Sequence, residues 1–152
     1  MPGLPGGSSA HVVDVREYAT PESYVDTSPG ILHADLRIET MHRDGYVAGV
    51  VVTYASSLGE YDVTVLQFAA NGDAIDYSKV HLRDACQQVV RAERLSDGSG
   101  LVYTRTDGST RAVVVAGDSE ISFCGCFHGD DPSRIAADAA QNVYGVLTNT
   151  SA

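Results

Sequence analysis

The chain has 152 residues, of which 43% are hydrophobic and 20% charged, the composition of an ordinary water-soluble globular domain. Its formal net charge is −10, and the sequence shows no basic patch. Because such a chain repels phosphates and anionic lipids, we expect no direct nucleic-acid binding and no membrane association. The sequence contains no phosphate loop, dinucleotide fingerprint, nucleophile elbow or His-Glu zinc motif, so we also expect no cofactor.

Residues 1–10 are rich in Gly, Pro and Ser and are predicted to form a flexible tail ahead of a single domain over 11–152. They lack the basic start and the apolar core of a secretory signal. Three cysteines form an odd and small set, which indicates reduced thiols rather than a disulfide framework. These features together predict a cytoplasmic location.

The first third of the domain is predicted to hold three strands and one helical turn. A weak alternation predicts a strand over 11–18, and Thr20-Pro21-Glu22 predicts a capped helical turn that runs to about residue 26. The clearest alternation lies in 32–39, where apolar and polar residues take turns and predict a strand with one buried face. The run over 46–54 is apolar on both faces and predicts a central strand.

The middle of the chain is predicted to continue the antiparallel meander. Two strands, over 61–70 and 74–82, are expected to form a hairpin around Asn71-Gly72-Asp73, because Asn-Gly supplies the positive φ angles of a tight turn. Residues 82–95 fit either a helix or a strand. The spacing of Leu82, Ala85, Cys86, Val89 and Val90 is helical, but we favour a strand that continues the meander.

The last third is predicted to hold a hairpin, a final strand and the best-signalled helix. The hairpin joins 101–106 to 111–117 through Asp107-Gly108, and the strand covers 120–128. In the helix, Asp131 is expected to cap and Pro132 to occupy the first position. Its alanine-rich stripe should place Ala139 and Val143 against the sheet and leave Asp138 and Gln141 in water.

The expected fold class is therefore α+β: an antiparallel β-meander of about seven to eight strands, curled or closed into a barrel, with one C-terminal helix packed on it. This order of elements is similar to that of pleckstrin-homology-like domains and of the helix-grip polyketide cyclases. The similarity lies in the layout, and the sequence carries no motif of either family.

Tyrosines provide the candidate ligand-binding residues, since the chain has eight of them and no tryptophan. If the sheet curls, Tyr46, Tyr54, Tyr77 and Tyr103 can line a cavity with their hydroxyls and orient a ligand. Alternatively, tyrosine is simply a residue that suits strands, because it buries its ring and hydrates its tip.

Cys124, Cys126 and His128 form a weak metal-binding candidate. Side chains two residues apart share one face of a strand, so two thiols and an imidazole would point the same way. The spacing of the two cysteines is too short for an ordinary zinc site, and no fourth ligand is evident, so we predict no metal. The alternative places the cysteines as small buried residues beneath the alanine-rich helix.

No residue pattern in the chain points to a specific reaction. The leading hypothesis is a non-catalytic domain that binds a small molecule or a protein partner and can self-associate as a homo-oligomer. One alternative is a small-molecule-binding β-barrel that acts as a carrier or as a cyclase- or isomerase-like enzyme. Another is an acidic inhibitor or nucleic-acid mimic, suggested by the net charge of −10.

Overall fold

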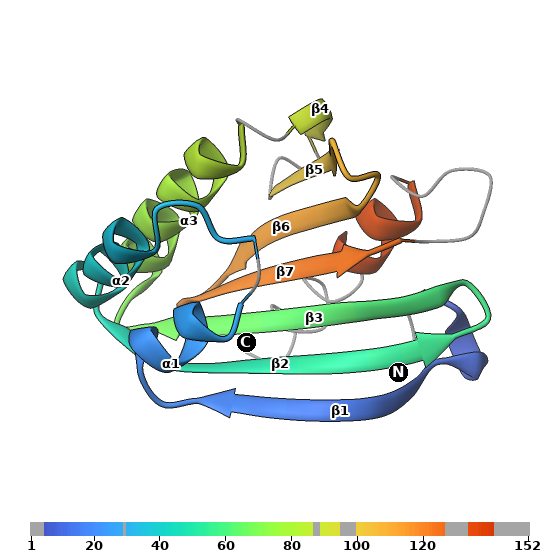
Figure 1. The fold of residues 1–152 in the computed structure, drawn as a ribbon, viewed down its shortest axis with the longest axis horizontal. Coiled ribbons are helices and arrows are strands. Elements are labelled where there is room, and N and C mark those ends of the chain that lie inside the picture. Colours follow the sequence, from blue (N-terminus) through green and yellow to red (C-terminus); the bar gives the residue numbers. More distant parts are fainter. Residues whose placement is uncertain (1–4, 29, 87–88, 95–99, 127–133, 142–152) are drawn as a thin grey trace.

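The computed structural model describes residues 5–28, 30–86, 89–94, 100–126 and 134–141. Seven antiparallel strands form one sheet in the order β1-β2-β3-β7-β6-β5-β4 (Figure 1). The sheet is open, with β1 and β4 at its two edges, and does not close into a barrel. The strands are β1 (His11–Tyr18), β2 (Tyr46–Ser56), β3 (Gly59–Phe68), β4 (Val89–Arg94), β5 (Gly100–Arg105), β6 (Thr110–Ala116) and β7 (Ser119–Gly125).

Helices cover both faces of the sheet. The N-terminal side of the chain supplies η1 (Gly7–Ser9), α1 (Pro21–Asp26), α2 (Ala34–Arg43) and α3 (Asn71–Ala85), and residues 134–141 form a further helix. Helices α1, α2 and α3 share a hydrophobic core with Leu66 and Phe68 of β3. The helix over 134–141 packs on the opposite face, against a core that includes Val63 of the same strand. The prediction of an α+β antiparallel fold is confirmed, whereas the prediction of a single helix is wrong.

Several local predictions are confirmed. Strand β1 has the predicted bounds, and β2, β3, β5, β6 and β7 lie where short β-branched and aromatic runs indicated them. Helix α1 begins at Pro21 after the N-cap Thr20, whose hydroxyl accepts a hydrogen bond from the backbone of Ser23. The side chain of Ser23 accepts in turn from the Thr20 backbone, which completes a capping box.

The prediction of a strand over 32–39 is wrong, because these residues enter helix α2. The alternation placed the apolar residues on one face, but Leu36 is 46% exposed while Arg37 and Met41 are buried. Arg37 and Met41 lie four residues apart, on one face of a helix. Gly45 follows the helix end with a φ of 69°, a conformation that favours glycine.

The prediction of a strand over 74–82 is also wrong. Ala74, Tyr77, Ser78 and His81 are buried on one side of helix α3, at the spacing of a helical face. Asn71-Gly72-Asp73 forms the first turn of that helix rather than a hairpin, with Asp73 near its positive end. Within 82–95, the helix continues to Ala85 and strand β4 begins at Val89, so each of the two interpretations holds for part of the segment.

The two ends of the described chain are held by specific contacts. Near the N-terminus, the hydroxyl of Tyr61 donates a hydrogen bond to the carbonyl of Pro5 (3.0 Å), and Ser9 bonds Ser57 (3.0 Å). In the helix over 134–141, Ala139 is buried against the sheet and Asp138 is exposed, as predicted. The predicted cap residues Asp131 and Pro132, and Val143, lie outside the described residues. None of the helices in the described ranges has the length and apolar character needed to cross a membrane.

Candidate ligand-binding site

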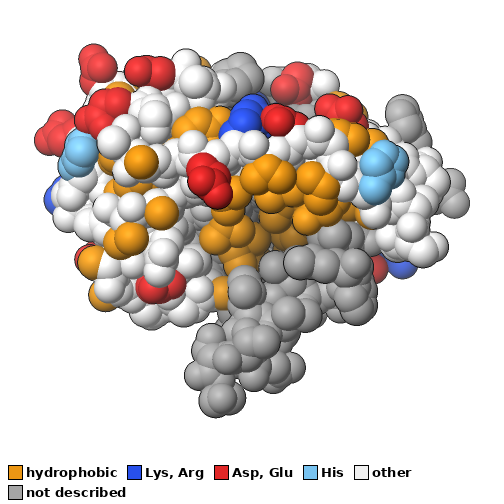
Figure 2. Space-filling view, turned by 90° about the horizontal axis from the view of Figure 1, so that it is seen from below, with side chains coloured by type: hydrophobic (Ala, Val, Ile, Leu, Met, Phe, Trp, Pro, Cys, Tyr) orange, Lys and Arg blue, Asp and Glu red, His pale blue; other side chains and the backbone are white. Residues whose placement is uncertain are grey.

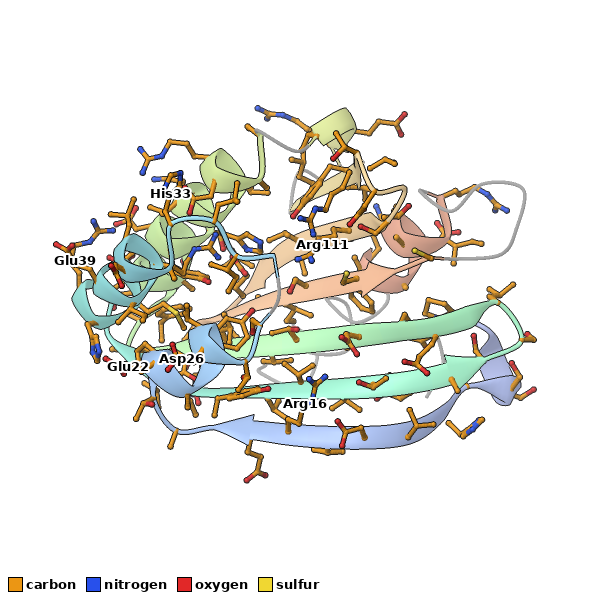
Figure 3. All side chains as sticks on the ribbon, in the orientation of Figure 1. Arg16, Glu22, Asp26, His33, Glu39 and Arg111 are labelled. Atoms are coloured by element: carbon orange, nitrogen blue, oxygen red, sulfur yellow. The ribbon has the colours of Figure 1, made fainter. Side chains whose placement is uncertain are left out.

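A polar cavity of about 160 Å³ lies between the face of the sheet and the segment that joins α1 to α2. Its walls include Arg16, Tyr24, Asp62, His81, Arg111 and Cys124, which come from six strands and helices. A smaller cavity of about 40 Å³ adjoins it and shares Tyr24, Ile31, His81 and Arg111 with it. Figure 3 shows Arg16 and Arg111 on this face of the sheet, well apart from His33 and Glu39 on the outer side of the helices.

Strand register explains why so many polar side chains meet here. Asp14 pairs with Thr53, Thr53 with Asp62, Asp62 with Cys124, Cys124 with Arg111, and Arg111 with Tyr103. Residues paired in this way stand side by side on one face of a sheet. A single polar row therefore crosses six strands on one face of the sheet. The residues before and after each of these positions point to the other face, toward the apolar core.

The β1 end of this row holds two carboxylates that share one counter-ion. The guanidinium of Arg16 lies 3.0 Å from the carboxylate of Asp14 and 3.8 Å from that of Asp62. Asp62 also accepts a hydrogen bond of 2.5 Å from the hydroxyl of Thr53. Arg16 therefore offsets part of the negative charge at this end of the row.

Above the sheet, His81 of α3 is oriented by a buried carboxylate. Its Nδ1 lies 2.7 Å from Glu120, and Ser78 donates a 2.5 Å hydrogen bond to the other oxygen of the same carboxylate. Burial alone would raise the pKa of Glu120, but attraction to His81 and these hydrogen bonds outweigh it and hold the pKa below its ordinary value. Glu120 is therefore ionised at neutral pH, and the His81 ring borders the cavity in a fixed orientation.

A second buried ion pair closes the smaller cavity. Arg37 of α2 donates hydrogen bonds of 3.1 Å to the carboxylate of Asp84 and to the hydroxyl of Tyr77, both on α3. Its guanidinium also stands 5.6 Å from the centre of the Tyr77 ring. Arg37 thus links α2 to α3 and neutralises the negative charge of Asp84.

Arg111 differs from these bases because no acidic group pairs with it. Across the described residues, no hydrogen bond or ion pair to its guanidinium is found; its Nε is buried without a hydrogen-bond partner, as are those of Arg16 and Arg37. Its two neighbours in the polar row are Tyr103 and Cys124. Burial raises the pKa of both, an effect that Arg111 opposes but does not cancel, so both neighbours are uncharged at neutral pH.

The tyrosines predicted to line a cavity do not come together. Tyr103 borders the smaller cavity, and Tyr77 is fully buried beside it on α3. Tyr46 packs on Phe68 and donates its hydroxyl to the Tyr18 carbonyl, whereas Tyr54 stacks on Tyr61 over the opposite core. An even spacing along β2 would put Tyr46 and Tyr54 on one face, but a register shift between Tyr46 and Ala48 separates them. The tyrosine that both cavities share is Tyr24, whose pKa burial raises to about 12.

The cysteine cluster is divided in the structure. Cys124 faces the polar cavity, Cys126 is exposed, and His128 lies outside the described residues. In the ranges that the structure describes, no group of three His, Cys, Asp or Glu side chains is placed to hold a metal ion. Cys124 does not lie beneath the alanine-rich helix, because that helix packs on the face of Ile121 and Phe123.

A larger and more open groove of about 450 Å³ lies over β1, β2 and β3, bordered by residues such as Glu17, Val50 and Val65. Nearby, Val12, Val13 and Val15 of the edge strand are each more than half exposed. Figure 2 views the molecule from the side of β1 and shows hydrophobic side chains gathered there. Few polar groups border this groove, so it offers less to orient a ligand than the polar cavity does.

Sequence patterns did not indicate most of the residues that form the polar cavity. Arg111 begins an apolar strand, and a lone arginine at a strand start is usually solvated. His81 and Arg37 were assigned to strands, so their helical faces were not considered. The i, i+3, i+4, i+7 spacing of Ala74, Tyr77, Ser78 and His81 was the available signal.

Comparison with known proteins supports the fold alone. No family model matches the chain, and no curated protein matches it. Among solved structures, the extracellular domain of PknH from Mycobacterium tuberculosis is similar, with a TM-score of 0.51 at 12% sequence identity. The similarity covers 92% of this chain and 87% of that domain. A shared fold does not assign a site, so the function is argued from this chain's own residues.

Proposed function

We propose that this chain is a non-catalytic ligand-binding domain whose ligand occupies the polar cavity between the sheet and the α1–α2 segment. The observation that supports the proposal is the convergence of hydrogen-bonding groups from separate elements on one enclosed space. Tyr24 comes from α1, His81 from α3, and Thr64 and Ser122 from the centre of the sheet. Small-molecule sites have this composition, with a few polar groups that fix orientation in an enclosed hollow.

Two of the side chains that border the cavity are held in place by acidic partners, which favours a role in ligand binding. His81 is held by Glu120, and Arg16 is held by Asp14 and Asp62, so their positions are set before any ligand arrives. A preorganised site loses little side-chain entropy when it binds, which raises affinity. The cavity also lies on the sheet, the most regular part of the molecule, rather than among exposed loops.

The test is a protein-observed NMR screen with small alcohols, amides and carboxylates at millimolar concentration. Hits should shift the amide signals of residues that border the cavity, such as Ile31, Arg111 and Ser122. The variant Ser122→Phe fills the cavity and should abolish these shifts. Ser57→Phe, on the exposed turn between β2 and β3, is the matched control and should retain them. Hits that cluster on the open groove over β1–β3, or no hits at all, would contradict the proposal.

A further inference from the structure

We propose that the ligand of the polar cavity is a small organic monoanion, a carboxylate that Arg111 binds through its guanidinium; this inference rests on the proposed ligand-binding function. The other described bases that border the two cavities each have an acidic partner. Arg16 is paired with Asp14 and Asp62, Arg37 with Asp84, and His81 with Glu120. Among the described residues that border the two cavities, Arg111 is the base left without an acid.

The guanidinium of Arg111 is partly buried, and its Nε is withdrawn from water without an acceptor. A buried donor that lacks an acceptor costs free energy, which a ligand that accepts from it can recover. The two neighbours of Arg111 in the polar row, Tyr103 and Cys124, are uncharged. Asp62 lies in the same row but pairs with Arg16.

The chemistry of a guanidinium selects the ligand class. Its planar set of N–H donors matches the two oxygens of a carboxylate or of a phosphate. The cavity offers one unpaired positive charge, and its other walls include the carboxylates of Asp62 and Asp84. One positive charge neutralises one negative charge, so a monocarboxylate suits the site better than a phosphate dianion does.

The size and the lining of the cavity narrow the ligand further. A volume of about 160 Å³ corresponds to about five water molecules at their volume in the liquid, so a ligand of roughly six non-hydrogen atoms fits. The same cavity is lined by Thr27, Ser28, Ser122 and His81. These groups would pair with hydroxyls on the ligand. A short hydroxy acid such as lactate therefore has a suitable size, charge and hydrogen-bonding capacity.

The experiment measures the melting temperature of the full chain with sodium L-lactate, lactamide, inorganic phosphate and sodium chloride at matched ionic strength. Lactamide has the same shape as lactate without the charge. A ligand that binds the folded state raises the melting temperature in proportion to the logarithm of its concentration. We expect lactate to raise it, and lactamide and chloride to have no comparable effect. A larger rise with phosphate than with lactate would overturn the choice of a monocarboxylate.

Two arginine variants test the assignment. Arg111→Met removes the charge and should weaken lactate binding by about tenfold or more, the loss expected for charge-assisted hydrogen bonds. Arg83→Met, on the exposed side of α3, is the matched control and should bind lactate as the parent chain does. Without ligand, Arg111→Met should melt no lower than the parent, because it removes an unpaired charge. A much lower melting temperature for this variant, with lactate binding retained, would overturn the assignment.

The outcome also separates this inference from the proposed function. If lactamide shifts the NMR signals of the cavity as strongly as lactate, and Ser122→Phe abolishes both effects, the cavity binds ligands but not through charge. The anion inference is then wrong and the ligand-binding proposal stands. If neither compound nor any member of the wider screen perturbs the cavity, both are wrong.

Discussion

Replacing Arg37 with methionine should cost far more stability than its place on a ten-residue helix suggests. The guanidinium is 4% exposed and holds both the carboxylate of Asp84 and the hydroxyl of Tyr77 at 3.1 Å. Methionine fills similar volume but leaves a buried carboxylate without a counter-ion. Breaking a buried pair in this way costs about 3–5 kcal/mol. For a chain of this size, that corresponds to a drop in melting temperature of roughly 6–20 °C.

Urea unfolding, followed by circular dichroism, measures this free energy directly. The double variant Arg37→Met/Asp84→Leu removes both charges and should recover most of the loss, because no uncompensated charge remains. Lys79→Met is the control. Lys79 pairs with Asp76 on the surface of α3, with both side chains more than half exposed, and its loss should cost no more than about 0.5 kcal/mol. If Arg37→Met cost under about 1 kcal/mol, or if the double variant were worse than the single one, the reasoning would be refuted.

Three further changes test other parts of the structure. Ala139→Leu should overpack the contact between the 134–141 helix and the sheet and lower the free energy of unfolding in urea by roughly 1–3 kcal/mol. The exposed Asp138→Ala should change that free energy by no more than about 0.5 kcal/mol. Equal unfolding midpoints for the two variants would mean that the helix is loosely docked. Glu120 has a folded-state pKa below its ordinary value of 4.5, so its stabilisation is complete above pH 4.5 and is lost as the pH falls through the folded pKa. Glu120→Gln should therefore lower stability at neutral pH and flatten the acid limb of a stability–pH profile, and an unchanged acid limb would contradict this. Thr20→Ala removes the cap of α1 and should cost about 1 kcal/mol, while Thr20→Ser should cost little; equal losses in thermal melts would show that the cap hydroxyl is unimportant.

Secondary structure was predicted correctly from the sequence where residues within one short segment determine it. Thr20-Pro21 specifies the start of α1, because a cap hydroxyl and a proline at the first helical position act within a single turn. Asp107-Gly108 specifies the β5–β6 turn, where Gly108 has a φ of 85°. The apolar runs of β2, β3 and β6 specify strands because their β-branched side chains suit a pleated surface.

Local signals failed where two structures fit the same residues. Residues 32–39 alternate well enough for a strand, yet they also consist mainly of good helix formers. Asn71-Gly72 can turn a hairpin or open a helix. In both places the choice depends on what the segment packs against, and that partner is remote in the sequence.

The sequence by itself therefore determined the α+β class, the antiparallel strands joined by short turns, the capped turn of α1 and the buried face of the last helix, because each rests on contacts between near neighbours in the chain. It did not determine that β3 pairs with β7, which breaks the predicted meander into two parts. The tertiary structure decided that α2 and α3 are helices, since Arg37 is buried only when Asp84 and Tyr77 are brought beside it. It also decided the candidate site. The polar row from Asp14 to Tyr103 exists only because strand order places β7 between β3 and β6, which sets Arg111 beside Cys124 rather than beside an acid.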